Sequence, residues 1–205
     1  MDKTQLLESL KREGFSKQIL DAFSKVNRED FITDQFKHRT YSDTALPIGE
    51  GQTISQPYTI ATMLSLLDLK KAQKVLELGS GSGYVLALLS EIVGKDGQVF
   101  GVERIKQLSD NSKKPLKEYS NVQVFHTDGS KGLEKNDPYD RIIISAACDK
   151  IPKTILNQLK HDGILVAPIG KPEQSLIKLQ RKNNKFVVKK EIPGFVFVPF
   201  IDSNN

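Results

Sequence analysis

The sequence predicts an α/β fold in which a mostly parallel sheet carries helices on both faces. Two observations lead to this prediction. Strand-like and helix-like segments alternate through the middle of the 205-residue chain, a pattern typical of parallel strands joined by helices. Within that region, residues 75–83 read Val-Leu-Glu-Leu-Gly-Ser-Gly-Ser-Gly, an apolar strand that runs into a glycine-rich turn before a helical stretch. With 38% hydrophobic residues, the chain has enough apolar side chains for the core of a single domain, residues 1–205.

The N-terminal part of the chain predicts short helices followed by a loop. Residues 4–36 have amphipathic spacing, with Leu6 and Leu10 on one face of the first helix. Asn27 is a residue type that caps helices. Proline, glycine and polar residues break any period over 37–56, so we expect a loop there.

A helix is predicted to begin at Pro57 and continue through Leu67, with Ser55 or Gln56 as its cap. The alternating core follows it. The strands are expected at 73–78, 98–103, 121–126, 140–145 and 163–168, and the helices at 82–93, 105–118 and 152–160.

The C-terminal part changes character and predicts antiparallel strands. Residues 175–180 and 185–190 flank Lys182-Asn183-Asn184, a sequence suited to a hairpin turn. Residues 194–199 are predicted to add a final antiparallel strand. The single domain thus divides into a helical and loop segment (1–56), a cofactor-binding core (57–170) and a C-terminal hairpin with its final strand (171–205).

Composition narrows the class of protein. The net charge of +5 makes nucleic-acid binding conceivable, but the lysine clusters lack interleaved aromatic residues and fit solvated faces better. The single cysteine, Cys148, fits a reducing compartment, and no apolar run is long enough for a membrane helix. We therefore expect a cytoplasmic protein without a signal peptide, and no metal site from three scattered histidines and one cysteine.

The glycine turn indicates which kind of ligand the fold holds. Its spacing is G-x-G-x-G with Tyr84 next, unlike the G-x-G-x-x-G of dinucleotide sites. Glu77 lies two residues before the first glycine, where a carboxylate would repel a pyrophosphate but attract a cation. The amino group and sulfonium of S-adenosylmethionine fit this charge, although a tight turn without any ligand remains an alternative.

Acidic residues also stand at the carboxyl ends of the next two predicted strands. Glu103 ends the strand 98–103, 20 residues after Gly83, where a carboxylate can accept hydrogen bonds from both ribose hydroxyls. Asp128 follows the strand 121–126 and could accept a hydrogen bond from an adenine amino group. One acid at a strand end is more often a solvated surface residue, but three at successive strand ends indicate a ligand crevice.

Residues 46–58 form a second candidate site segment, Leu-Pro-Ile-Gly-Glu-Gly-Gln-Thr-Ile-Ser-Gln-Pro-Tyr. Its glycines, hydroxyls and amides, just before a helix, are typical of site-building loops. Ser55 could act as a helix cap, as a site residue, or as both.

In these segments the chain resembles the protein-L-isoaspartate O-methyltransferase family along nearly its whole length. The core motif 75–84 is common to many methyltransferases, whereas the segment 46–58 is far more specific. The resemblance also rests on residues 28–31, 103–105, 128–129, 138–142, 146–147, 151–152, 158–160, 163–170 and 197–199.

The resemblance implies a Rossmann-like methyltransferase that transfers a methyl group from S-adenosylmethionine to the α-carboxylate of L-isoaspartyl residues in damaged proteins. Its partners would be isoaspartyl proteins and peptides, with no nucleic acid or membrane, and we expect a monomer. By the same resemblance, Ser55 would be the catalytic residue. The cofactor would be held by Thr53, Ile54, Glu77, Gly79, Ser80, Gly81, Glu103, Arg104, Asp128 and Gly129, and the substrate by Gln52, Thr53, Ile54, Ser55, Val196, Phe197 and Val198.

The chain departs from the family pattern at two positions. Thr127 stands where many members have glycine, which would narrow the adenine site, and Ile201 stands where some members have a hydroxyl. Two other functions remain open from the residues: a methyltransferase of the same fold that acts on RNA or a small molecule, and a cofactor-binding module without catalysis.

Overall fold

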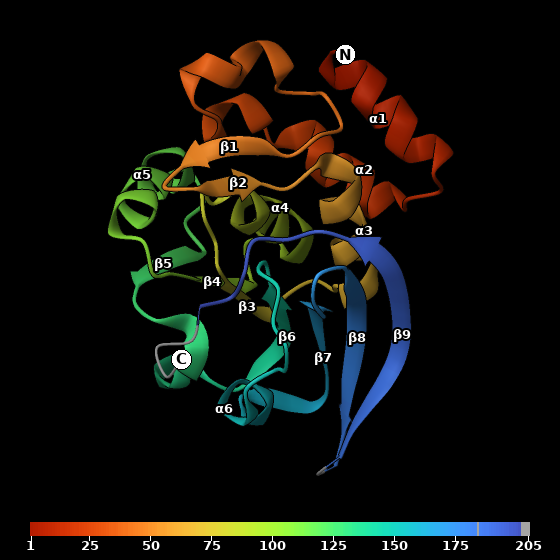
Figure 1. Cartoon of the computed structure of the whole chain (residues 1–205), viewed down its shortest axis with the longest axis vertical. Helices are drawn as coiled ribbons and strands as arrows, with labels where there is room; N and C mark the ends of the chain where they lie inside the picture. The colour runs from red at the N-terminus through yellow and green to blue at the C-terminus, as the bar shows by residue number, and fades with distance from the viewer. Residues whose placement is uncertain (184, 202–205) are drawn as a thin grey trace.

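The computed structural model describes residues 1–183 and 185–201. A seven-stranded sheet in the order β5-β4-β3-β6-β7-β8-β9 forms the centre of the molecule (Figure 1). The pairs among the first five strands of this order are parallel, and β7–β8 and β8–β9 are antiparallel. The strands are β3 (Lys74–Leu78), β4 (Gln98–Glu103), β5 (Val122–His126), β6 (Tyr139–Ile144), β7 (Leu159–Ile169), β8 (Gln174–Lys182) and β9 (Lys185–Phe195).

Helices cover both faces of the sheet, as predicted, but unevenly. One face packs against α3 (Pro57–Leu67), α4 (Tyr84–Val93) and α5 (Lys106–Leu116), and the other mainly against the short α6 (Lys153–Asn157). Side chains alternate along β3, so Val75 lies in the first core, and Leu76 and Leu78 lie in the second.

The N-terminal segment packs over the α3–α4 face and reaches the carboxyl ends of the strands (Figure 1). It contains α1 (Lys3–Arg12), α2 (Lys17–Lys25) and the 3-10 helices η1 (Arg28–Phe31) and η2 (Asp34–Arg39). The expectation of amphipathic helices over 4–36 is confirmed. Asn27 precedes η1, but its side chain makes no capping hydrogen bond, so that expectation was wrong.

The loop predicted over 37–56 contains a β-hairpin, β1 (Leu46–Gly49) and β2 (Gln52–Ile54). Its turn residues Glu50 and Gly51 both have positive φ, the geometry of a tight type I′ connection. Proline and glycine at 47, 49 and 51 conceal the strand pattern in the sequence, because they are the residues that the turn and the edge pairing require.

The helix predicted over 152–160 ends at Asn157, and Leu159 already belongs to β7. Leu159 pairs with Tyr139 of β6 and is buried, so tertiary pairing overrides the helical spacing. The helix beginning at Pro57 is confirmed, with Gln56 rather than Ser55 at the cap position and no side-chain capping bond from it.

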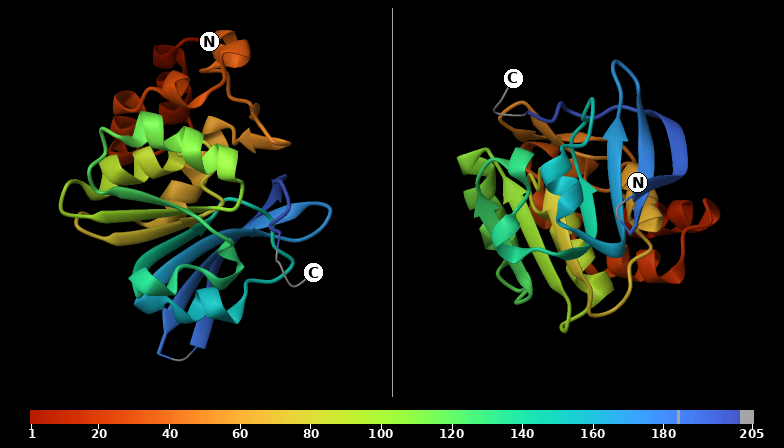
Figure 2. Two further views of the ribbon diagram at one scale, coloured as in Figure 1. Left: turned by 90° about the vertical axis from the view of Figure 1, so that its left-hand side faces the viewer. Right: turned by 90° about the horizontal axis from the view of Figure 1, so that it is seen from below.

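The predicted hairpin near the C-terminus is confirmed as β8 and β9, while Asn184 of its turn lies outside the described residues. The final antiparallel strand over 194–199 is not formed. Gly194 and Phe195 end β9, after which the chain turns across the sheet, and Pro199 makes a parallel bridge to Ala147. Figure 2 shows this segment turning away from the long hairpin, and we call residues 196–201 the tail.

Two features are absent from the described residues, a membrane-spanning helix and a metal-binding cluster. Among the described residues, none of the helices has the length and apolar character that crossing a bilayer demands. Within 1–183 and 185–201, histidine, cysteine and carboxylate side chains do not gather in groups of three that could hold a metal ion.

Candidate active site

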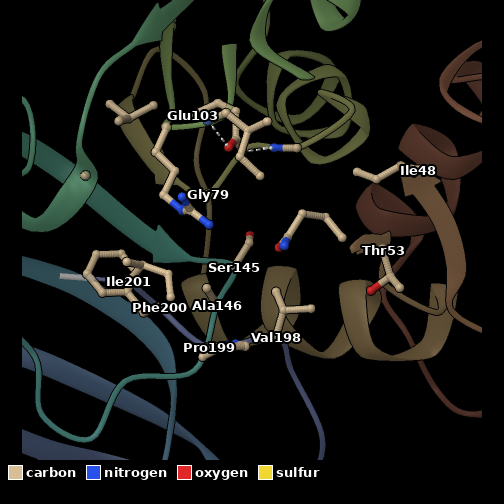
Figure 3. Close-up of a pocket in the computed structure, with 16 residues that line it drawn as sticks. Ile48, Thr53, Gly79, Glu103, Ser145, Ala146, Val198, Pro199, Phe200 and Ile201 are labelled. Atoms are coloured by element: carbon tan, nitrogen blue, oxygen red, sulfur yellow. Dashed lines mark hydrogen bonds between the residues drawn. The ribbon is translucent and has the colours of Figure 1, made fainter. Parts of the chain in front are cut away.

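A pocket opens at the carboxyl ends of the parallel strands, beside the point where the chain order reverses between β3 and β6. Ligands of open α/β sheets bind at such a point. Figure 3 shows the residues that line it, which we call the main pocket. They are Ile48, Gln52, Thr53, Gly79, Gly81, Val102, Glu103, Arg104, Ile105, Gly129, Ser145, Ala146, Val198, Pro199, Phe200 and Ile201.

Glu103 is the buried acid of the main pocket. Its Oε2 accepts the Gly81 N–H at 2.8 Å and its Oε1 accepts the Ile105 N–H at 2.8 Å (Figure 3). These bonds fix the carboxylate, and each oxygen keeps a lone pair for a further donor. A fixed carboxylate with two acceptor oxygens is suited to a pair of vicinal hydroxyls.

Glu77 is the second buried acid, and it is only 1% exposed. Its Oε1 accepts the Ser145 hydroxyl at 2.7 Å across the β3–β6 boundary. Its Oε2 is buried and has no hydrogen-bond partner in the described part of the chain. Burial raises the pKa of Glu77 to about 8; the Ser145 hydroxyl opposes this increase, and the Glu103 carboxylate adds to it.

Ser55 and Glu77 line a second, adjacent pocket, which we call the serine pocket. It shares Thr53, Gly79, Gly81 and Ser145 with the main pocket. The remaining lining residues are Ile54, Ile60, Met63, Ser80, Ser82, Tyr84 and Val85. The hydroxyl-bearing segment before α3 therefore meets the acid of β3 at one cavity.

A surface groove leads to the same place. It runs between the start of α3 and the end of β9 with the tail, and Thr53 lines it as well as both pockets. Its other lining residues are uncharged: Ala45, Gln56, Tyr58, Thr59, Ile192, Pro193, Gly194, Phe195, Val196, Phe197 and Val198. An elongated partner in this groove would reach the serine pocket at Thr53.

The segment that carries Ser55 is held at both ends. Asp43 Oδ1 accepts the Tyr58 N–H at 2.8 Å, which satisfies a free donor at the start of α3. The fully buried Arg28 donates from Nη2 to the Thr44 carbonyl at 3.2 Å and lies 5.5 Å from the centre of the Tyr84 ring. These contacts fasten the hairpin to α3 and α4, on either side of the serine pocket.

The tail closes the opposite side of the main pocket. The Ala147 N–H donates to the Val198 carbonyl and the Phe200 N–H donates to the Ala147 carbonyl, both at 2.8 Å. Gln174 Oε1 accepts the Phe197 N–H at 2.7 Å. The tail therefore lies between the main pocket and the surface groove and lines both.

The structure brings most of the sequence-predicted residues together. Glu77, Ser80, Ile54 and Ser55 line the serine pocket, and Gln52, Glu103, Arg104 and Gly129 line the main pocket; Gly79, Gly81 and Thr53 line both, and Val196, Phe197 and Val198 line the groove. Asp128 is outside these linings, and its carboxylate accepts the Ser130 N–H and hydroxyl at 2.8 Å. Its adenine role remains a prediction, as does the narrowing attributed to Thr127.

Sequence reasoning missed Ser145, Asp43 and the apolar wall formed by Ile48, Ala146 and Phe200. Ser145 directly follows β6, so the strand-end rule that identified Glu103 could have found it. No sequence signal marks Asp43, because its partner is a backbone N–H that only the folded hairpin brings close.

The site fits S-adenosylmethionine on observations of the structure. Glu77 Oε2 is a buried acceptor to which no described residue donates, and Glu103 presents two fixed acceptor oxygens. The backbone at Gly79 and Gly81 has positive φ, and an added Cβ at Gly81 would lie 3.1 Å from Ile48 Cδ1. The positive φ favours glycine at both positions, and the lack of side chains lets a ligand approach the backbone closely. The fold and the site together define a Rossmann-like, S-adenosylmethionine-dependent methyltransferase.

Comparison with known proteins makes the assignment more specific. The sequence model of the family "Protein-L-isoaspartate(D-aspartate) O-methyltransferase (PCMT)" matches residues 1–205. The chain belongs to this family. A protein-L-isoaspartate O-methyltransferase of Ignicoccus hospitalis is 42% identical over 206 residues, which cover 98% of this chain and 97% of that one.

Solved structures agree with the fold. A protein-L-isoaspartate O-methyltransferase superposes with a TM-score of 0.89 at 29% identity, covering 96% of this chain and 65% of the other, which is the longer one. A Plasmodium falciparum β-aspartate methyltransferase, solved with S-adenosyl-L-homocysteine, gives a TM-score of 0.84 at 24% identity and covers 98% and 99% of the two chains. The second similarity concerns the fold alone.

Proposed function

We propose that this protein repairs damaged proteins by transferring the methyl group of S-adenosylmethionine to the α-carboxylate of L-isoaspartyl residues. The observation that carries the proposal is the junction at Thr53, where the main pocket, the serine pocket and the surface groove meet. A donor in the first cavity and an elongated acceptor in the groove would meet beside Ser55. Family membership over the whole chain supports the same reaction.

Methyl transfer to a carboxylate requires little from the protein beyond positioning the two reactants. A carboxylate with a pKa near ~4 is already ionised at neutral pH and needs no general base. Consistent with this, His38, His126 and His161 are absent from the linings of the three cavities. Bringing two reactants into line and excluding water can supply up to ~7–11 kcal/mol.

Ser55 is proposed to donate its hydroxyl to the acceptor carboxylate and to aim one oxygen at the methyl group. Its place between β2 and α3, at the serine pocket, supports this role. Glu103 is proposed to hold the ribose hydroxyls of the donor, and Arg104 and Gly129 to border the adenine. Bound S-adenosylmethionine would supply the electrophilic methyl group.

The acceptor is proposed to be recognised through its main chain. An isoaspartyl residue differs from aspartate by a backbone detour through the side chain, while the neighbouring residues vary. An extended peptide laid in the groove along residues 194–198 and the start of α3 would meet backbone groups and uncharged side chains. Such contacts would distinguish the rerouted backbone of isoaspartate from that of aspartate and would tolerate different flanking residues.

A methyl-transfer assay tests the proposal directly. Incorporation of labelled methyl is measured with a peptide containing L-isoaspartate, the matched aspartyl peptide and a structured RNA. We expect transfer to the isoaspartyl peptide alone. Equal labelling of the aspartyl peptide, or labelling only of RNA, would overturn the proposal, and the second result would favour the same-fold RNA methyltransferase.

Location and assembly belong to the same proposal. We propose a cytoplasmic monomer that binds no nucleic acid, supported by the free and buried Cys148 and by lysine clusters that lack interleaved aromatic residues. Light scattering after size exclusion checks the monomer, and titration with RNA checks the absence of nucleic-acid binding. A dimer mass or micromolar RNA affinity would contradict it.

A further inference from the structure

The buried carboxylate of Glu77 has two oxygens in different situations. Oε1 accepts the Ser145 hydroxyl at 2.7 Å, whereas Oε2 is buried without a hydrogen-bond partner in the described part of the chain. An ionised, half-satisfied carboxylate is costly in such a place. The group is more stable there with a proton on Oε2, unless a positive charge enters the cavity.

Among the described residues, those that line the serine pocket around Glu77 carry no positive charge. The α3 side contributes apolar side chains, and the β2–α3 segment contributes Thr53 and Ser55. The titratable side chain facing it from α4 is the buried Tyr84, a neutral phenol whose pKa burial raises further. Glu103 is the charged neighbour, and its negative charge favours a protonated Glu77. A cationic ligand is therefore the natural partner of Oε2.

We infer that Glu77 distinguishes the methyl donor from its demethylated product by their charge, releasing the Oε2 proton when the sulfonium binds and retaining it when the neutral thioether is bound. This inference rests on the proposed function, which makes the donor a sulfonium. During transfer the methyl carbon forms a bond to the carboxylate oxygen as its bond to sulfur breaks, and that electron pair stays on sulfur. With the sulfur facing Oε2, the charge beside the carboxylate is then gone, although the α-ammonium that donor and product share remains, so Oε2 recovers a proton from solvent.

The consequence is a site that holds the donor more tightly than the product without a change of shape. Near neutral pH, Glu77 is largely protonated in the free protein, because burial raises its pKa to about 8. Donor binding would then release about one proton and product binding almost none. Raising the pH removes the cost of deprotonation, so donor affinity should rise by up to ~10-fold per pH unit until the pKa is passed, while product affinity stays level.

Calorimetric titration tests this without any acceptor peptide. S-adenosylmethionine and S-adenosylhomocysteine are titrated at pH 7 in phosphate and in Tris, whose ionisation enthalpies differ, and the slope gives the protons released. We expect about one for the donor, close to none for the product, and no difference between them in Glu77→Gln. Ser145→Ala, which keeps the acid, should preserve the difference.

Equal proton counts for donor and product in the unsubstituted protein would overturn the inference and leave the proposed function standing. So would a difference that persists in Glu77→Gln. If that variant does not fold, the ratio of the two affinities of the unsubstituted protein between pH 6 and 9 decides, and a constant ratio contradicts the inference. Failure of both ligands to bind would instead overturn the proposed function, and this inference with it.

Discussion

At the scale of single residues, the candidate side chains line different cavities. Glu103 is fixed by two backbone N–H groups within the main pocket, whereas Ser55 faces the neighbouring cavity from the segment before α3. Glu77 lies between them as a buried acid. Substitutions at these positions should therefore change different measured constants.

Ser55→Ala should lower turnover of an isoaspartyl peptide by about 10- to 100-fold, the effect of losing one hydrogen bond to a charged group. Affinity for S-adenosylmethionine should change little. The matched control is Ser65→Ala, which removes an exposed hydroxyl from α3, the helix that follows Ser55. Full turnover in Ser55→Ala would exclude Ser55 from the mechanism.

Glu103→Lys should weaken S-adenosylmethionine binding by at least ~10-fold, because it removes both acceptor oxygens and leaves the Gly81 and Ile105 N–H groups without their partner. Isothermal titration measures the change. Glu118→Lys reverses the charge of a solvent-exposed glutamate and serves as the control. An unchanged dissociation constant in Glu103→Lys would refute the ribose assignment.

Glu77 should also make stability depend on pH. Its pKa is raised to about 8 in the folded protein from 4.5 when exposed, so the folded state binds its proton more tightly. The stabilisation is complete below pH 4.5 and is lost as pH rises towards 8, by up to ~1.4 kcal/mol per pH unit. Urea unfolding should show Glu77→Gln gaining on the unsubstituted protein between pH 5 and 8. A constant difference would contradict the buried, protonated acid.

At the scale of elements, the hairpin β1–β2 places Ser55 only because it is fastened to two helices. Asp43 holds the first turn of α3, and Arg28 joins the Thr44 carbonyl to the face of α4. The glycine turn between β3 and α4 forms the floor against which this hairpin rests, through Ile48 and Gly81. A substitution that breaks one of these hydrogen bonds should displace Ser55 without changing the residues proposed to bind the donor.

Asp43→Ala should lower kcat several-fold and destabilise the protein by about 1 kcal/mol, since it frees the Tyr58 N–H. The dissociation constant for S-adenosylmethionine should stay nearly constant. Asp43→Asn keeps an oxygen acceptor and should restore most of the turnover. If Asn fails to restore turnover while the protein remains folded, Asp43 does not act as a positioning residue through this bond.

At the scale of the whole molecule, the tail connects the main pocket with the surface groove. Val198 lines the main pocket and the groove, so one segment borders the cavities proposed for donor and acceptor. The tail is held by the parallel bridge to Ala147 and by Gln174 at the start of β8. The antiparallel extension of the sheet thus carries the element that completes the site.

Gln174→Ala should lower the affinity for S-adenosylmethionine and raise the KM for peptide, each by several-fold. The reason is that the Phe197 N–H loses its 2.7 Å acceptor. Titration and steady-state kinetics measure the two effects. Gln180→Ala lies on the same strand, away from the three cavities, and should leave both constants unchanged. A change in only one constant for Gln174→Ala would contradict the coupling.

Local sequence alone is enough to predict the core strands, the glycine turn and the acids near the carboxyl ends of β3 and β4. Each of these depends on local periodicity or on a residue type that a single turn demands, so neighbouring residues suffice to predict it. The whole-length resemblance added the segment around Ser55. These parts contain most of the residues that line the serine pocket.

Contacts made in the folded chain set four other features: the hairpin over 46–54, the end of α6 at Asn157, the parallel bridge of the tail and the Ser145 contact to Glu77. Each depends on a contact partner roughly eight to seventy residues away in the sequence. The local spacing of apolar and polar residues contains no information about such a partner. The buried state of Glu77 has the same origin: a carboxylate becomes a proton-holding acid only when α3, α4 and β6 close around it.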